Sequence, residues 1–157
     1  MKKIIFAMVV AVAAAAIVLP LAGAGSTPGH ATGSVDWDYQ GTVTGHVSFN
    51  ANAKTGGSLD YQNSKGQWLH GVVTPGSYKQ IGEHSAVFAG MITAGSEDYL
   101  PGTGQFYAKV VDGGTSGSNG DQIAVLANDF RGVDAASGDY DMAQGAGIVT
   151  GGNLAVH

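Results

Sequence analysis

Residues 35–51, VDWDYQGTVTGHVSFNA, alternate apolar and polar side chains over two successive stretches of the chain. Val35, Trp37 and Tyr39 fall on one side, with an aspartate after each of the first two on the other side. The alternation resumes at Val43 and continues to Ala51. A period of two residues is the pattern of a strand with one buried face. This stretch therefore predicts two half-buried strands and places the domain in the all-β class.

Segments of the same kind recur along the rest of the chain, and loops rich in glycine separate them. The further candidate strands are 58–62, 67–73, 85–93, 104–112, 121–128 and 154–157. Glycine supplies 26 of the 157 residues, well above the usual share of about 7%, which indicates many tight turns. Such spacing is typical of an antiparallel sandwich or barrel. We predict a single antiparallel β-sandwich of about 7–9 strands over residues 35–157.

The amino terminus has the pattern of an export signal. Two lysines precede the apolar run IIFAMVVAVAAAAIVL (4–19), and Ala22 and Ala24 supply the small residues that a signal peptidase requires. We predict a helical signal peptide over 1–24, a flexible leader over 25–34, and an extracellular or cell-surface location. The alternative is an uncleaved membrane anchor formed by residues 4–24, because about 20 apolar residues cross a bilayer.

Charge and composition narrow the possible partners. Cleavage after Ala24 leaves 133 residues, enough for one domain with one core. The leader carries two of the seven basic residues and none of the twelve acidic ones, so cleavage changes the net charge from −5 to −7. Nucleic acid and anionic membrane surfaces are therefore excluded as partners, and membrane contact is expected only through an uncleaved leader. The chain has no cysteine, so its stability cannot depend on disulfides.

The loop VVDGGTSGSNGDQIAV (110–125) raises the question of a cation site. Asp112 and Asp121 lie at the ends of consecutive candidate strands, and Asn119 lies between them with several glycines. Calcium takes six to eight oxygen ligands, which these side chains and backbone carbonyls could supply. The spacing does not match an EF-hand loop, and a plain hairpin turn accounts for the same residues. We expect no required cofactor, with calcium at Asp112, Asn119 and Asp121 as the candidate ion.

Motifs for catalysis are absent from the sequence. It contains no G-x-S-x-G elbow, no H-E-x-x-H and no cysteine, so thiol chemistry and cysteine-ligated zinc are excluded. His46, His70 and His84 fall on or beside candidate strands and could meet across a sheet. Glu83, Asp98 or another acidic residue could supply the carboxyl pair of a glycosidase if two such groups approached within about 5–9.5 Å. A second acidic set could add ligands near the glycine-rich loop: Asp129, Asp134, Asp139 and Asp141.

The order of several short motifs resembles a known family. GHVSFNA, GGSLDYQ, AVFAG, GQFYAKVVDGG, GDQIAV and GGNLAVH follow one another between Gly45 and His157. This succession is similar to that of a family of small β-domains in secreted prokaryotic proteins, often accessory modules of larger surface proteins. The resemblance implies a β-sandwich without a settled activity.

Aromatic residues are the strongest pointer to function. Exported sugar-binding domains stack exposed rings on pyranose faces, and Tyr99, in the loop GSEDYLPGTG, is the aromatic most suited to contact a ligand. Trp37 and Trp68 lie in alternating strands and are expected in the core. We predict a non-catalytic exported module that binds or builds structure, with a polysaccharide or an envelope or matrix protein as partner. The alternatives are a carbohydrate-binding module and a small secreted hydrolase.

Overall fold

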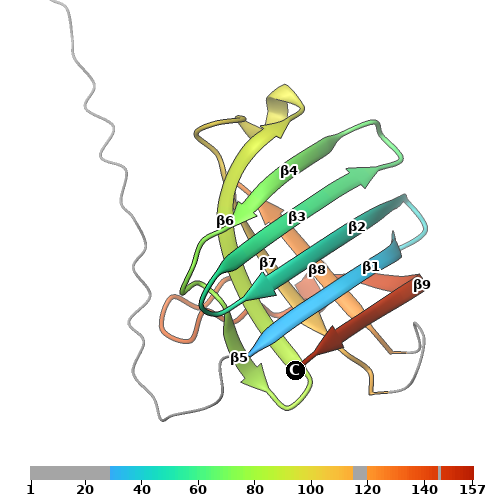
Figure 1. Ribbon diagram of the computed structural model, residues 1–157. Coiled ribbons are helices and arrows are strands. Elements are labelled where there is room, and N and C mark those ends of the chain that lie inside the picture. The colour runs from blue at the N-terminus through green and yellow to red at the C-terminus, as the bar shows by residue number, and fades with distance from the viewer. Residues whose placement is uncertain (1–28, 115–119, 145) are drawn as a thin grey trace, which may run out of the picture.

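The computed structural model describes residues 29–114, 120–144 and 146–157, and it confirms the all-β class and the antiparallel pairing (Figure 1). The predicted signal peptide, 1–24, lies outside the described residues. In chain order the elements are β1 (His30–Tyr39), β2 (Val43–Asn52), β3 (Gly56–Asn63), β4 (Trp68–Val73), β5 (Lys79–Gly82), β6 (Ser85–Gly95), η1 (Glu97–Tyr99), β7 (Gln105–Val111), β8 (Gln122–Ala127), η2 (Met142–Gln144) and β9 (Gly147–Val156). The two η elements are short 3-10 helices.

The sheet closes on itself, which corrects the predicted sandwich. The strand order β4-β3-β2-β1-β9-β8-β7-β6 is joined end to end by pairing of β4 with β6, from Leu69 opposite Gly95 to Val73 opposite Gly90. The domain is thus a closed eight-stranded antiparallel barrel, with β5 added at the edge of β6. Alternation along a strand specifies one buried face. It does not specify whether that face meets a second sheet or surrounds a barrel axis.

Closure depends on the length of β6. The first residues of this eleven-residue strand pair with β5, and its later residues pair with β4 along the same edge. Ser77 fills the interval between those two partners, because its hydroxyl donates to Ala89 O at 2.7 Å and accepts from Ala89 N at 3.2 Å. The ladder along this edge is therefore continuous although two strands contribute to it.

The amino-terminal strand begins earlier than the alternation indicated. β1 starts at His30, so residues 30–34, predicted as part of the leader, are strand residues. They pair with β2 on one side, His30 opposite Asn52, and with the end of β9 on the other, Ala31 opposite Val156. This pairing orders a segment whose own sequence has no apolar periodicity. In the described part of the chain, no helix has the length and hydropathy needed to cross a membrane.

Aromatic rings fill the barrel, and glycines on facing strands make room for them. The Phe88 ring lies 5.4 Å from that of Phe49 and 6.5 Å from that of Phe106, and all three side chains are buried. A β-carbon at Gly90 would lie 2.6 Å from the Phe106 ring and even closer to a backbone oxygen of β4. Small and large residues thus complement each other across the narrow interior, as an eight-stranded barrel requires.

A second, smaller cluster lies on the outside of the barrel. Val87, Tyr107 and Ala124, from β6, β7 and β8, point outward and are covered by Tyr140 from the β8–β9 loop. The loop is nineteen residues long (128–146) and turns back across these three strands. One stretch of the barrel wall is therefore buried on both faces.

Candidate functional site

A cavity of about 350 Å³ lies at the end of the barrel where the β1–β2 turn, the β3–β4 turn and η1 converge. Pockets for small ligands have volumes of about 300–1,000 Å³ and are common at the mouths of barrels. The lining residues are Trp37, Tyr39, Val43, Tyr61, Asn63, Lys65, Gln67, Tyr99, Ile123, Val125, Leu126, Tyr140 and Gly147. This combination of aromatic rings and amides makes the cavity the candidate ligand site.

Three aromatic rings form one wall of the cavity. Trp37 and Tyr61 are stacked, with ring centroids 5.6 Å apart and planes inclined by 18°. Tyr99 packs edge-on against Tyr61 at 6.2 Å. The predicted ligand residue Tyr99 is half-buried at the end of η1 and packs against the core. Its ring therefore belongs to a composite aromatic surface and is not an isolated exposed ring.

Burial raises the pKa of both tyrosine hydroxyl groups in this wall above the ordinary 10.0. Desolvation raises the pKa of Tyr61, although hydrogen bonds with Asn63 and Tyr99 oppose the shift. Desolvation also raises the pKa of Tyr99, and the neighbouring Tyr61 and Asp98 raise it further. Both hydroxyl groups remain neutral at physiological pH and can donate as well as accept hydrogen bonds.

Amide side chains from the β3–β4 turn form the polar rim. Asn63 Oδ1 accepts from the backbone N–H groups of Lys65 at 3.0 Å and Gln67 at 3.1 Å, which holds the turn closed. Asn63 Nδ2 donates to Gln67 Oε1 at 2.9 Å and to Tyr61 Oη at 3.2 Å. Gln67 Nε2 donates to Asp98 Oδ2 at 3.1 Å. The rim is thus pre-organised by its own hydrogen bonds, which lowers the entropy cost of binding.

The barrel wall is incomplete beside the cavity. β8 pairs with β9 only through Gln122 opposite Ile148 and Ile123 opposite Gly147, so residues 124–127 have no partner on β9. Val125 and Leu126 from this unpaired stretch line the cavity, and Tyr140 lines it from the loop outside. The cavity therefore extends through the side of the barrel.

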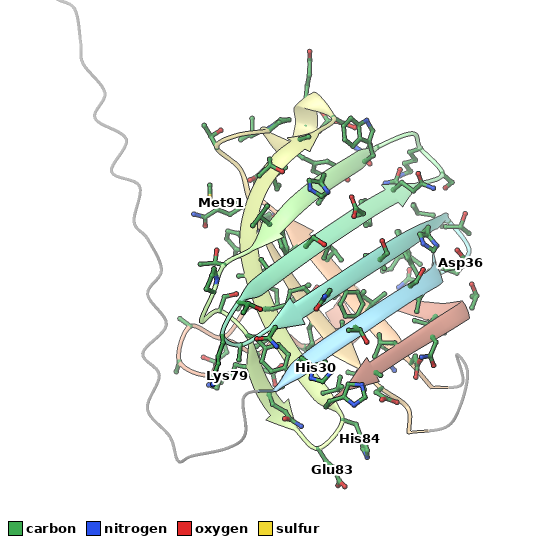
Figure 2. The ribbon with its side chains drawn as sticks, viewed as in Figure 1. His30, Asp36, Lys79, Glu83, His84 and Met91 are labelled. Carbon is green, nitrogen blue, oxygen red and sulfur yellow. The ribbon has the colours of Figure 1, made fainter. Side chains whose placement is uncertain are left out.

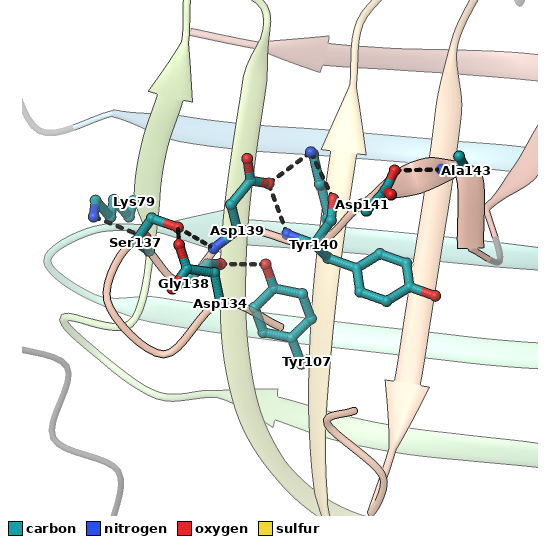
Figure 3. Close-up of polar contacts among 10 residues, drawn as sticks. Lys79, Tyr107, Asp134, Ser137, Gly138, Asp139, Tyr140, Asp141 and Ala143 are labelled. Atoms are coloured by element: carbon teal, nitrogen blue, oxygen red, sulfur yellow. Dashed lines mark hydrogen bonds and ion pairs between the residues drawn. The ribbon is translucent and has the colours of Figure 1, made fainter. Parts of the chain in front are cut away.

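Buried polar contacts hold the β8–β9 loop at this opening (Figure 3). Lys109 Nζ, on β7, donates to Asp139 Oδ1 at 2.6 Å and to Tyr140 O at 2.8 Å, and the lysine is only 9% exposed. Tyr107 Oη donates to Gly138 O. Burial raises the pKa of Tyr107, and the charge of Asp139 adds to the shift. These contacts fix the position of Tyr140 over the opening.

The predicted cation residues have different environments. Asp112 accepts from Gly114 N at 2.8 Å, as expected for a turn, and Asn119 lies outside the described residues. Asp121 is 1% exposed, and its Oδ1 accepts from Gly113 N at 2.8 Å. Its Oδ2 is buried with no hydrogen-bond partner in the described structure. Within the described ranges, no three acidic, histidine or cysteine side chains are grouped as metal ligands.

The second acidic set is held by contacts of its own. Asp129 binds Arg131, whose hydrogen bonds lower the pKa of that carboxyl. Hydrogen bonds from Ser137 and from Ala136 N lower the pKa of Asp134. Asp139 binds Lys109 and Asp141 accepts from Ala143 N at 3.0 Å. These carboxylates organise the β8–β9 loop.

The candidate catalytic residues do not gather as the sequence allowed. Glu83 and Asp98 flank the two ends of β6, which separates them by roughly 30 Å at about 3.3 Å per residue, too far for a glycosidase pair. His46 and His70 each pair with an aspartate on a neighbouring strand. His84 lies 3.9 Å from Glu83 in the turn between β5 and β6 (Figure 2).

Sequence reasoning placed one tryptophan correctly and missed most of the cavity. Trp37 is buried as predicted, but Trp68 points outward from β4 and is 48% exposed. Asn63 and Gln67 were missed because they read as ordinary turn residues. Their position in the turn that follows the aromatic Tyr61, two and six residues after it, was the only available signal.

Comparison with protein-family models, with curated proteins and with solved structures finds no match to this chain.

Proposed function

We propose that the protein is an exported binding module that takes a saccharide unit into the cavity at the barrel end without chemical turnover. The observation that carries this proposal is the stacked wall of Trp37 and Tyr61 beside the amide rim of Asn63 and Gln67. Aromatic faces stack on the C–H groups of a sugar ring, and amides pair with its hydroxyl groups.

The charge of the lining narrows the ligand class. Among the described residues that line the cavity, Lys65 alone carries a formal charge, and it lies at the exposed rim. A neutral saccharide, or one with a single acidic group directed at Lys65, fits this distribution. The described residues that line the cavity include no carboxylate, imidazole, serine or threonine, the groups that most often act as acid, base or nucleophile. Binding there is therefore proposed as non-catalytic.

Tryptophan fluorescence provides the direct test. The chain has two tryptophans, and Trp68→Phe leaves Trp37, in the cavity wall, as the only indole. A sugar that enters the cavity shifts or quenches the emission of this variant in a saturable way. A panel of neutral and acidic mono- and oligosaccharides that leaves the emission unchanged at millimolar concentration contradicts the proposal.

A pair of glutamine variants locates the site. Gln67→Ala removes an amide at the rim of the cavity. Gln62→Ala is the control, because Gln62 is an exposed residue of β3 next to Asn63 and does not line the cavity. We expect affinity to fall about tenfold in the first variant, the worth of one hydrogen bond to a buried polar group, and to stay unchanged in the second. Equal affinities would place the ligand elsewhere on the barrel.

The proposal includes the cellular setting expected from the sequence. A polysaccharide of the cell surface or surrounding matrix is the proposed partner, and a structural role through an envelope or matrix protein is the alternative. Expression with the full leader followed by intact-mass measurement tests export. A chain that begins at Gly25 supports cleavage, and a membrane-bound chain that begins at Met1 supports the anchor of residues 4–24.

Calcium binding at Asp121 is a second proposal. A carboxylate oxygen that is buried without a hydrogen-bond partner costs free energy, and a bound cation would offset that cost. Asp112 is the neighbouring acidic residue on the same hairpin. The ion would serve stability and not the cavity.

Thermal unfolding of the exported chain in excess calcium and in chelator tests this second proposal. Calcium at 100 times its dissociation constant stabilises the folded state by about 2.7 kcal/mol, which raises the midpoint by roughly 5–15 °C. Asp121→Asn should abolish the shift, and Asp141→Asn, in the β8–β9 loop, should preserve it. Coincident curves for the parent chain would show that the hairpin is a turn only.

A further inference from the structure

The outer face of the barrel carries a serine, a histidine and an aspartate in hydrogen-bond sequence. Ser34 Oγ lies 3.3 Å from His46 Nε2, and His46 Nδ1 lies 2.8 Å from Asp36 Oδ1. Figure 2 places Asp36 on the wall formed by β1 to β4. We propose that these residues form a nucleophilic centre that hydrolyses short-chain carboxylic esters, separate from the cavity.

The strand register creates this arrangement. Ser34 and Asp36 are two residues apart on β1 and so share the outward face, and His46 lies directly opposite Asp36 on β2. A carboxylate can only accept hydrogen bonds, so the ring nitrogen beside Asp36 carries the proton in the neutral imidazole. The other ring nitrogen, Nε2, is then an acceptor aimed at the Ser34 hydroxyl. This is the tautomer that a serine nucleophile requires of its base.

The next strand provides a donor for the developing charge. Asn153 on β9 pairs directly opposite Ser34, so the two residues share the outward face with β-carbons about 4.5–5.5 Å apart. Asn153 is exposed, and its amide can donate to an oxyanion formed beside Ser34. The surface is open, with side-chain exposures of 41% for His46 and 66% for Asp36. Within the described residues Ser34 is exposed and does not line the cavity, so short acyl groups are specified.

The reaction proceeds in two steps, acylation of Ser34 and hydrolysis of the acyl-serine. His46 Nε2 takes the proton of Ser34 as Oγ attacks the ester carbonyl, and the same proton passes to the departing alkoxide as the carbon–oxygen bond breaks. Water then attacks the acyl-serine carbonyl while His46 Nε2 takes its proton, and that proton returns to Ser34 Oγ as the acyl–oxygen bond breaks and the carboxylic acid leaves. Asp36 is a positioning residue that fixes the imidazole tautomer.

The protein contains a matched control for this centre. Asp60 and His70 form a second aspartate–histidine pair across β3 and β4, with His70 Nδ1 2.6 Å from Asp60 Oδ1. In the described structure no serine or threonine hydroxyl is hydrogen-bonded to the His70 ring; the nearby Thr93 hydroxyl donates to the backbone carbonyl of His70 instead, at 3.2 Å. Ser48 lies on the same outward face, opposite both Ser34 and Asp60, and has no hydrogen bond to an imidazole there. The same type of pair therefore occurs with and without an adjacent nucleophile.

Covalent labelling tests the proposal. A fluorophosphonate should add to the exported chain with loss of fluoride, and peptide mapping should place the adduct on Ser34. Ser34→Ala should abolish it and Ser48→Ala should not. His46→Gln should slow labelling about 100-fold, within the range of general-base effects, whereas His70→Gln should change it less than twofold. Because these side chains are on the surface, the substitutions should leave the fold intact. The unfolding midpoint of each variant checks this.

Ester turnover and tautomer state complete the test. Exposed imidazoles hydrolyse p-nitrophenyl acetate without a serine, so the informative quantity is the loss in His46→Gln relative to His70→Gln. Asp36→Asn should lower turnover and alter the ring ¹⁵N shifts of His46, with the unfolding midpoint unchanged. Absence of a Ser34 adduct, or equal turnover in the two histidine variants, would show that the three residues form only a cross-strand hydrogen-bond network.

Discussion

Replacement of Lys109 by methionine should release the β8–β9 loop from the barrel wall. The lysine ammonium group lies 2.6 Å from Asp139 Oδ1 and 2.8 Å from Tyr140 O, and the residue is 9% exposed. Methionine keeps most of the buried aliphatic stem and removes the charge and both hydrogen bonds. The variant therefore isolates the polar anchor from the apolar packing beneath the loop.

The magnitude follows from the environment of each contact. A hydrogen bond to a charged group contributes about 1.5–3 kcal/mol when buried. The contact with Tyr140 O is buried, whereas the Asp139 side chain is 44% exposed, so solvent screens the ion pair. We expect a total loss of about 2–3 kcal/mol and a midpoint lower by roughly 5–12 °C. Because Tyr140 lines the cavity, saccharide affinity should fall as well.

The assay is equilibrium urea unfolding combined with hydrogen exchange of residues 128–146. Lys79→Met is the matched control, because Lys79 Nζ also donates to this loop, at 2.8 Å to Ser137 O, but is exposed. Its effect should stay within about 0.5 kcal/mol. If Lys109→Met matched Lys79→Met in stability and in loop protection, the polar anchor would contribute nothing. The apolar cluster around Tyr140 would then hold the loop alone.

Two further predictions concern the barrel interior. Gly90→Ala should destabilise the protein by about 3 kcal/mol in urea unfolding, because the new methyl group would meet the Phe106 ring and a backbone oxygen. Gly82→Ala, whose methyl group would make only an ordinary van der Waals contact with Ser85 at 3.6 Å, should change stability by less than about 0.5 kcal/mol, and equal effects would refute the packing argument. Burial raises the pKa of Tyr61 and Tyr99 above the ordinary 10.0, so these phenols ionise at lower pH in the unfolded state than in the folded state. Their contribution to the free energy of unfolding should therefore be fully present below pH 10 and should decline as the pH rises above it. A constant free energy of unfolding between about pH 9 and about pH 11, with no phenolate absorbance gained on unfolding, would contradict that sign.

Strand positions were predictable because each strand buries one face. The alternation from Val35 to Ala51 corresponds to β1 and β2, and the remaining candidate segments overlap the other strands of the barrel. Trp37 was correctly assigned to the core, but Trp68 was not. Alternation of apolar and polar residues identifies the two faces of a strand. At the ends of the strand it does not show which face points into the core. Trp68 is the first residue of β4, where turn geometry and pairing decide the direction of the side chain.

The candidate sites depend on contacts between residues distant in the chain. Trp37, Tyr61 and Tyr99 form one wall although they lie on β1, β3 and η1. Pairing of β1 and β3 with β2 brings the first two together, and pairing of β4 with β6 adds Tyr99. Ser34 and His46 meet through the β1–β2 register, which a shift of one residue would abolish. Neither the spacing of the three aromatic residues nor the spacing of Ser34 and His46 matches a motif that a search along the sequence could find.

The sequence by itself determined the all-β class, the strand-forming segments and the independence of the domain from disulfides, because side-chain alternation and composition are local properties. The tertiary structure decided barrel over sandwich, the cavity and the docked loop. Pairing of β4 with β6 and the placement of Lys109 beneath Asp139 are long-range contacts, and their free energy depends on how the whole chain closes.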